Sequence, residues 1–110
     1  MAYDEFLAER IQKVLADKNI PSEQKKMFGG LAFMINGKMS VGIIKNELMA
    51  RVGPEFHTEA LKKDGARPMD FTGRPMQGYI YVSPDGFDLD TQLEFWVDKC
   101  LEFNKILTSD

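Results

Sequence analysis

The chain has 110 residues, which is the length of a single domain. Hydrophobic residues make up 44% of the sequence and charged residues 28%, as in an ordinary globular protein. The formal net charge of -3 at pH 7 excludes a global positive field that would attract nucleic acid. The single cysteine, Cys100, excludes an internal disulfide and a cysteine-type zinc site.

The sequence also predicts the cellular location of the protein. No apolar run approaches the roughly 20 residues that a membrane span requires, so we expect no membrane contact. The first residues, 3 to 6, are acidic and amphipathic, unlike a signal peptide. A lone thiol fits a reducing compartment. We therefore expect a cytoplasmic protein that uses no cofactor and no metal.

The first predicted element is an amphipathic helix over residues 4 to about 18. The residues that recur at helical spacing and form one apolar stripe are Tyr3, Leu7, Ile11, Val14 and Leu15. Asp4 is a suitable N-cap, because its carboxylate can accept hydrogen bonds from the first backbone N–H groups of the helix.

Three strands are predicted next, over residues 26–35, 38–44 and 47–52. The dipeptide Asn36-Gly37 separates the first two strands. Both central positions of a type I′ turn require φ > 0, which these residue types tolerate. The pattern predicts an antiparallel meander in the centre of the chain.

A second helix is predicted to begin at Pro54, whose fixed φ suits the first helical position, and to end at Gly65. Residues 66–76 are expected to be irregular, although residues 69–71 can pair with the strand that follows. That strand is predicted over residues 77–82, where the side chains alternate.

A last helix is predicted over residues 88 to 107. The elements follow the order α-β-β-β-α-β-β-α, with the strands clustered apart from the helices. This order predicts an α+β fold, a two-layer single domain with a mainly antiparallel sheet and helices packed on one face. It argues against a parallel doubly wound sheet, which needs βαβ alternation.

Four segments carry a family resemblance, at residues 27–33, 37–39, 51–53 and 67–76. Through them nearly the whole chain resembles the TfoX N-terminal domain, a family named for a regulator of competence genes. The resemblance implies the same two-layer arrangement and a regulatory, non-enzymatic role. Longer members carry a helical C-terminal domain, and we expect residues 1–110 to form one TfoX-type domain without it.

Our leading interpretation is a stand-alone regulatory domain that contacts an unknown protein partner in transcription or competence-type regulation. The alternative is a module that binds nucleic acid or a small anionic ligand. Residues 25–74 contain nine Lys or Arg against five Asp or Glu. This basic middle segment supports the alternative, whereas the net charge of the whole chain does not indicate nucleic acid.

The candidate binding residues of this segment combine cationic, aromatic and glycine positions. Arginine suits phosphate and carboxylate groups, aromatic rings offer stacking surface, and paired glycines permit close approach. Arg51, Arg67 and Arg74 are predicted to lie close together around residues 69–76. Their competing role is to tie that loop down through Asp70 and backbone carbonyls. The candidate set is Lys26, Phe28, Gly29, Gly30, Arg51, Arg67, Phe71 and Arg74.

No catalytic residue is predicted. Cys100 falls on the core stripe of the last helix, where a thiol is buried and inert. His57, the only histidine, is expected on a solvated helix face without a second metal ligand. The pair Gly29-Gly30 lacks the Gly-Lys-Ser/Thr ending and the following helix of a phosphate loop.

The last helix predicts self-association. Beyond its core stripe it carries Phe95, Phe103 and Ile106 on a second face, and an exposed apolar patch of this kind usually marks an interface. We expect a two-fold homodimer through these residues. The alternative is that the first helix covers the second face within the same chain.

Overall fold

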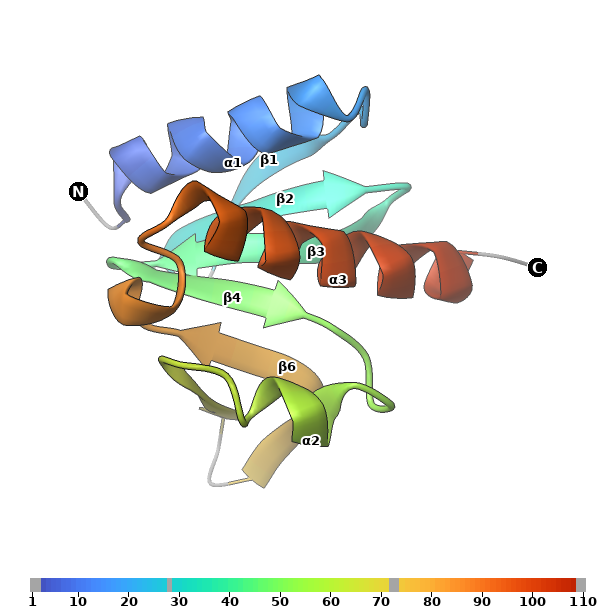
Figure 1. Ribbon diagram of the computed structural model, residues 1–110. Helices are drawn as coiled ribbons and strands as arrows, with labels where there is room; N and C mark the ends of the chain where they lie inside the picture. Colours follow the sequence, from blue (N-terminus) through green and yellow to red (C-terminus); the bar gives the residue numbers. More distant parts are fainter. Residues whose placement is uncertain (1–2, 28, 72–73, 109–110) are drawn as a thin grey trace.

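A six-stranded antiparallel sheet with helices on one face forms the fold (Figure 1). The computed structural model describes residues 3–27, 29–71 and 74–108, with side chains for all of these except 27, 70, 71 and 74–76. The strands follow the order β1-β2-β3-β4-β6-β5. The predicted α+β class is confirmed. The elements are α1 (Glu5–Asp17), β1 (Glu23–Met27), β2 (Gly30–Ile35), β3 (Lys38–Ile44), β4 (Glu47–Arg51), α2 (His57–Ala60), β5 (Ala66–Phe71), β6 (Arg74–Val82), the 3-10 helix η1 (Pro84–Gly86) and α3 (Asp90–Thr108).

Helix α1 begins where the sequence predicts. Asp4 Oδ1 accepts hydrogen bonds from the N–H groups of Phe6, at 2.9 Å, and Leu7, at 3.2 Å. The cap therefore satisfies two backbone donors that have no partner inside the helix. Of the predicted apolar stripe, Leu7, Ile11 and Leu15 are buried in the core, whereas Tyr3 and Val14 are partly exposed.

The predicted hairpin between β2 and β3 is also confirmed. Ile35 pairs with Lys38, which leaves Asn36 and Gly37 as a two-residue loop. Their φ values are 55° and 78°, as a type I′ turn requires. Asn36 Nδ2 also donates to Asn104 Oδ1 on α3, at 2.9 Å, so the loop is attached to the helix layer.

The prediction of a single first strand over residues 26–35 is wrong, because the chain forms two strands there. Met27 pairs with Gly30, and Gly29 has φ 75°, so Gly29 lies in the hairpin turn and Gly30 begins β2. Gly30 also lies against β3, since a Cβ atom at this position would be 2.0 Å from the carbonyl oxygen of Ile43. The sequence missed β1 because it is an exposed edge strand whose side chains do not alternate between apolar and polar.

The second predicted helix is much shorter than expected. Only the four residues of α2 are helical, and turns lie on both sides of them. Residues 66–71, expected to be irregular, form strand β5 instead. Pro68 is tolerated because β5 is an edge strand, where a missing N–H group need not weaken the sheet. Asp70 and Phe71 pair with Pro75 and Arg74, so β6 begins three residues before the strand predicted over residues 77–82.

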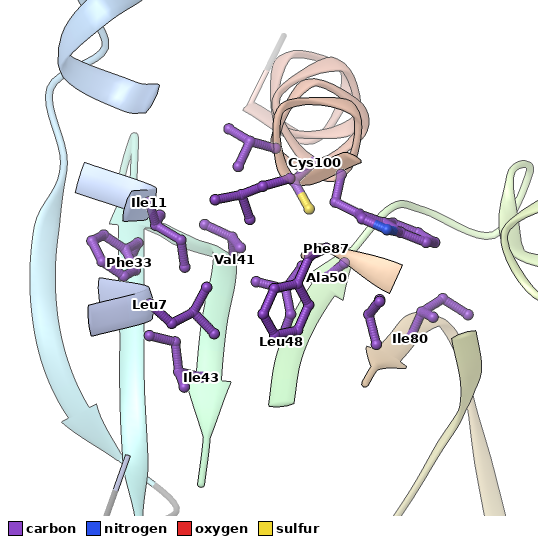
Figure 2. Close-up of a cluster of buried hydrophobic side chains, with 14 of the residues drawn as sticks. Leu7, Ile11, Phe33, Val41, Ile43, Leu48, Ala50, Ile80, Phe87 and Cys100 are labelled. Atoms are coloured by element: carbon purple, nitrogen blue, oxygen red, sulfur yellow. The ribbon is translucent and has the colours of Figure 1, made fainter. Parts of the chain in front are cut away.

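The core lies between the sheet and the two long helices (Figure 2). Side chains from α1, α3 and the four central strands meet there, and each large one that is fully buried contributes about 1.5–3 kcal/mol. Trp96 Nε1 donates a hydrogen bond to the carbonyl oxygen of Gly86, at 3.1 Å. Figure 2 labels Leu7, Ile11, Phe33, Val41, Ile43, Leu48, Ala50, Ile80, Phe87 and Cys100.

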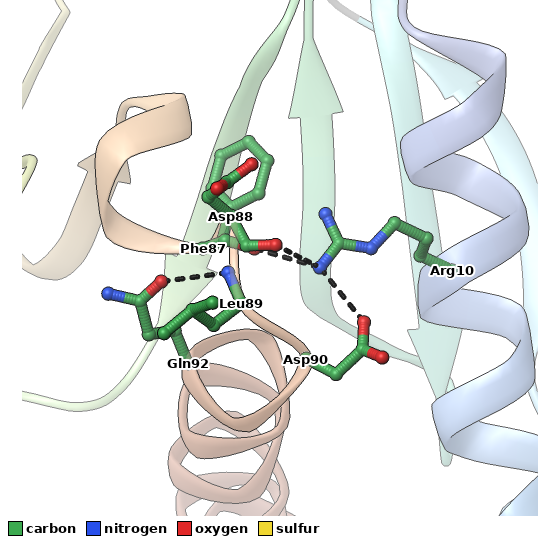
Figure 3. Close-up of polar contacts among 6 residues, drawn as sticks. All are labelled: Arg10, Phe87, Asp88, Leu89, Asp90 and Gln92. Atoms are coloured by element: carbon green, nitrogen blue, oxygen red, sulfur yellow. Dashed lines mark hydrogen bonds and ion pairs between the residues drawn. The ribbon is translucent and has the colours of Figure 1, made fainter.

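Arg10 joins α1 to the start of α3 (Figure 3). Its Nη2 atom donates to the carbonyl oxygens of Phe87, at 2.9 Å, and Asp88, at 3.2 Å. It also lies 3.3 Å from a carboxylate oxygen of Asp90. Within the part of the chain that the structure describes, no helix is long and apolar enough to cross a membrane.

Candidate functional site

Arg51 lies at the point where β3 and β4 separate. The pairing of these strands ends at Val41 and Ala50, one residue before Arg51. The guanidinium group lies 5.1 Å from the ring centre of Tyr79. It lies 5.7 Å from the ring centre of Phe103 on α3. Stacking of this kind stabilises the junction between sheet and helix, which is a structural role.

Arg67 lies near the other end of β4. It forms an ion pair with Glu47, the first residue of that strand, and its guanidinium carbon is 4.7 Å from the ring centre of Tyr81. Arg51 is the last residue of β4, and it contacts different aromatic rings. The two arginines therefore contact different partners, and the prediction that Arg51, Arg67 and Arg74 lie close together around residues 69–76 stays a prediction.

Lys26 lies on the opposite edge of the sheet from Arg67. Lys26 is exposed on β1, and Arg67 lies on β5, which is the opposite edge of the sheet. Five strand spacings of about 4.8 Å separate these two edges. The side chains of Arg74, Phe71 and Asp70 lie outside the described part of the structure, as does the whole of residue 28.

Gly29 lies in the β1–β2 turn, and Gly30 is the first residue of β2. Gly29 supplies the left-handed φ, and nothing lies within 4 Å of the position its Cβ would take. Gly30 lets β2 approach the carbonyl oxygen of Ile43. Both glycines thus have a backbone role.

The only thiol and the only imidazole of the chain are both buried. Burial raises the pKa of the Cys100 thiol to about 12, so the group is a neutral thiol at physiological pH. His57 was expected on a solvated face, but only 9% of its surface is exposed. Its Nδ1 atom accepts a hydrogen bond from the N–H of Gly78, at 3.0 Å. The described residues contain no group of three potential metal ligands.

The second face of α3 is largely covered by the chain segment between β4 and β5. Phe95 is half-buried against Phe56, with ring centres 6.1 Å apart. Phe103 lies on Gly53, where a Cβ atom would be 2.3 Å from the phenylalanine ring. The alternative prediction placed α1 over this face. The segment between β4 and β5 covers it instead. Ile106 remains 68% exposed beyond it.

A groove of about 270 Å³ lies where this segment meets the C-terminal half of α3. Its apolar lining includes Pro54, Phe56, Phe103 and Ile106. Three charged residues also line it, two acidic and one basic, namely Glu55, Glu102 and Lys99. The groove brings together two of the three predicted interface residues. Sequence reasoning could not find its opposite wall, because those residues lie about fifty positions earlier in the chain.

No curated protein and no solved structure matches the sequence. The family model described as TfoX N-terminal domain matches residues 15–104, a span that contains all six strands, most of α3 and only the last turn of α1. Because this match covers most of the chain, the protein belongs to the TfoX N-terminal domain family.

Proposed function

We propose that the protein is a non-enzymatic regulatory domain that contacts another protein in transcription or competence-type regulation. The contact surface is the groove beside Ile106. The observation that carries this proposal is the position of Ile106, a large apolar residue that is 68% exposed at the edge of an apolar groove.

The reactive side chains of the chain support a role without catalysis. Cys100 is buried with a pKa of about 12, so it offers no thiolate for nucleophilic attack near neutral pH. The Nδ1 atom of His57 is occupied by the Gly78 N–H. A general base must reach a substrate proton, and this imidazole lone pair faces the backbone of its own chain instead.

The size and lining of the groove favour a protein partner over a small molecule. Pockets for drug-sized ligands have volumes of about 300–1,000 Å³ and enclose most of the ligand. This groove has a volume of about 270 Å³, which suits one or two side chains of a partner. Aromatic residues beside charged ones, as in this lining, are typical of a protein interface.

The proposal can be tested by complementation in a strain that lacks the gene. The wild-type protein and an Ile106→Glu variant are each expressed at equal levels, and transcripts of the dependent genes are measured. Phe6→Glu is the matched control, since Phe6 is also a large apolar residue with 68% exposure but lies on α1. We expect the wild type and the control to restore the transcript pattern and Ile106→Glu to fail.

Full complementation by Ile106→Glu contradicts the groove as the contact surface. Ile106→Ser serves as a second variant, because it removes the apolar side chain without adding a charge at the helix C-terminus. Circular dichroism and thermal unfolding of each purified variant show whether the fold is retained. A variant that folds normally and fails to complement supports the proposal.

A further inference from the structure

We infer that the groove binds Ile106 of a second copy of this chain, in a two-fold homodimer. This inference rests on the proposed function, which assigns the groove as a contact surface. The occupant is identified by three properties that the groove and the end of α3 share: their position side by side, their size and their charge.

The position of Ile106 satisfies the geometry of a two-fold contact. In such a contact the same surface of each copy is used, so a residue that enters a groove on the partner must lie next to the same groove on its own chain. Ile106 lines the edge of the groove and is 68% exposed. A rotation axis beside it therefore brings each Ile106 to the groove of the other copy.

The apolar surface that each copy offers matches that of the other. The groove presents Pro54, Phe56 and Phe103, and its volume is about 270 Å³, enough for one aliphatic side chain. Both the groove and Ile106 are open to water in the single chain. One reciprocal contact removes both apolar surfaces from water at once, which is the main driving force for association.

Charges around the groove are complementary to those beside Ile106. The groove is lined by two carboxylates and one ammonium group, those of Glu55, Glu102 and Lys99, which leaves one net negative charge. The ammonium group is 3.5 Å from a carboxylate oxygen of Glu102. The residue before Ile106 is Lys105, which is exposed. Glu102 lies one turn before Ile106 on the same helix and is paired with Lys99, so an incoming Ile106 brings Lys105 toward Glu55, the other carboxylate of the groove.

Light scattering and sedimentation velocity at micromolar concentrations test the dimer. We expect the wild type to have twice the chain mass of 12.5 kDa. Ile106→Glu should raise the dissociation constant about 100-fold or more, because it would bury an unpaired carboxylate in an apolar groove. The control Phe6→Glu should leave the dimer unchanged.

Charge reversal tests the orientation of the two copies. Lys105→Glu should weaken the dimer about tenfold, and adding Glu55→Lys to the same chain should restore its affinity. A wild-type monomer up to millimolar concentration overturns the dimer. A dimer that tolerates Ile106→Glu also overturns it, as does a double variant no tighter than Lys105→Glu alone.

The results separate this inference from the proposed function. A monomeric wild type whose Ile106→Glu variant still fails to complement means that another protein occupies the groove, so the dimer is wrong and the function stands. If Ile106→Glu dissociates the dimer but the variant still complements, the dimer is correct and the proposed function of the groove is wrong.

Discussion

His57 accepts a hydrogen bond from the backbone N–H of Gly78 at 3.0 Å, and this contact attaches α2 to β6. Gly78 has φ 86°, and a Cβ atom there would be 2.8 Å from the carbonyl carbon of Gly53. The backbone of β6 therefore lies directly against the segment that forms one wall of the groove. A histidine on a very short helix thus helps to position the proposed contact surface.

Replacing His57 tests this role. His57→Leu should lower the free energy of unfolding by about 1–3 kcal/mol, because it leaves the buried N–H of Gly78 without an acceptor. His57→Asn should lose less, since its Oδ1 atom can take the place of Nδ1. Urea unfolding of both variants measures the difference. Equal losses in the two variants would show that the hydrogen bond contributes nothing.

Gly37 tests the hairpin between β2 and β3. Gly37→Val should destabilise the protein by about 1–3 kcal/mol, because a β-branched residue is strained at positive φ. Nothing lies within 4 Å of the position of its Cβ, so the cost is conformational and does not come from a clash. Gly37→Asn should therefore be much milder, since asparagine tolerates this conformation. Thermal unfolding that is unchanged in Gly37→Val would count against the turn.

The pKa of Cys100 predicts a loss of stability at high pH. Burial raises this pKa from 9.0 to about 12, so above pH 9 the unfolded chain releases the thiol proton while the folded chain keeps it. The free energy of unfolding then falls as the pH rises from 9 toward 12, by up to about 1.4 kcal/mol per pH unit from this group. Cys100→Ala lacks this contribution, so the stability difference between wild type and variant should shrink with rising pH.

Denaturant unfolding at pH 7, 9 and 10 measures that difference, and titration of lysines and tyrosines cancels between the two proteins. A difference that stays constant over this range would contradict the raised pKa. Thiol labelling provides an independent check. Native protein should react with a thiol reagent far more slowly than unfolded protein, and rapid labelling of the native state would mean that Cys100 is accessible.

The sequence predicted those elements whose signals are complete within a few residues. The carboxylate of Asp4 and the N–H groups it caps are neighbours in the chain, and Asn36-Gly37 specifies its own backbone conformation. Strand β3 has the predicted bounds, because its apolar alternation lies between two turns. Local chemistry decides each of these features, so no knowledge of distant contacts is needed.

The predictions fail where distant partners decide the structure. Pro68 favours a loop locally, but pairing of β5 with β6 makes its segment the edge strand of the sheet. His57 accepts a hydrogen bond from Gly78, twenty-one residues later, and no local sequence pattern predicts that contact. The groove also forms between distant parts of the chain, since Gly53 contacts Phe103. The amphipathic pattern of α3 predicted an apolar second face but not the segment that covers most of it.

Arg10 was not distinguished by the sequence from the other polar residues of α1, yet it makes three contacts at the start of α3 (Figure 3). Two of these are hydrogen bonds to backbone carbonyl oxygens, of Phe87 and Asp88. The third is an ion pair with Asp90, whose side chain is 100% exposed, whereas that of Arg10 is only 17% exposed. An ion pair with a fully exposed partner contributes little, so the carbonyl contacts should account for most of the effect of Arg10.

A pair of variants separates these contributions. Arg10→Met keeps the aliphatic packing and should lower the free energy of unfolding by about 1–3 kcal/mol, because it removes charge-assisted hydrogen bonds to the two carbonyl groups. Asp90→Ala should leave stability nearly unchanged. The loss in Arg10→Met should persist in 1 M NaCl, since salt screens exposed ion pairs much more than partly buried hydrogen bonds. Urea unfolding at low and high salt measures both effects. If Asp90→Ala costs as much as Arg10→Met, and if both losses disappear at high salt, the ion pair and not the carbonyl contacts attaches α1 to α3.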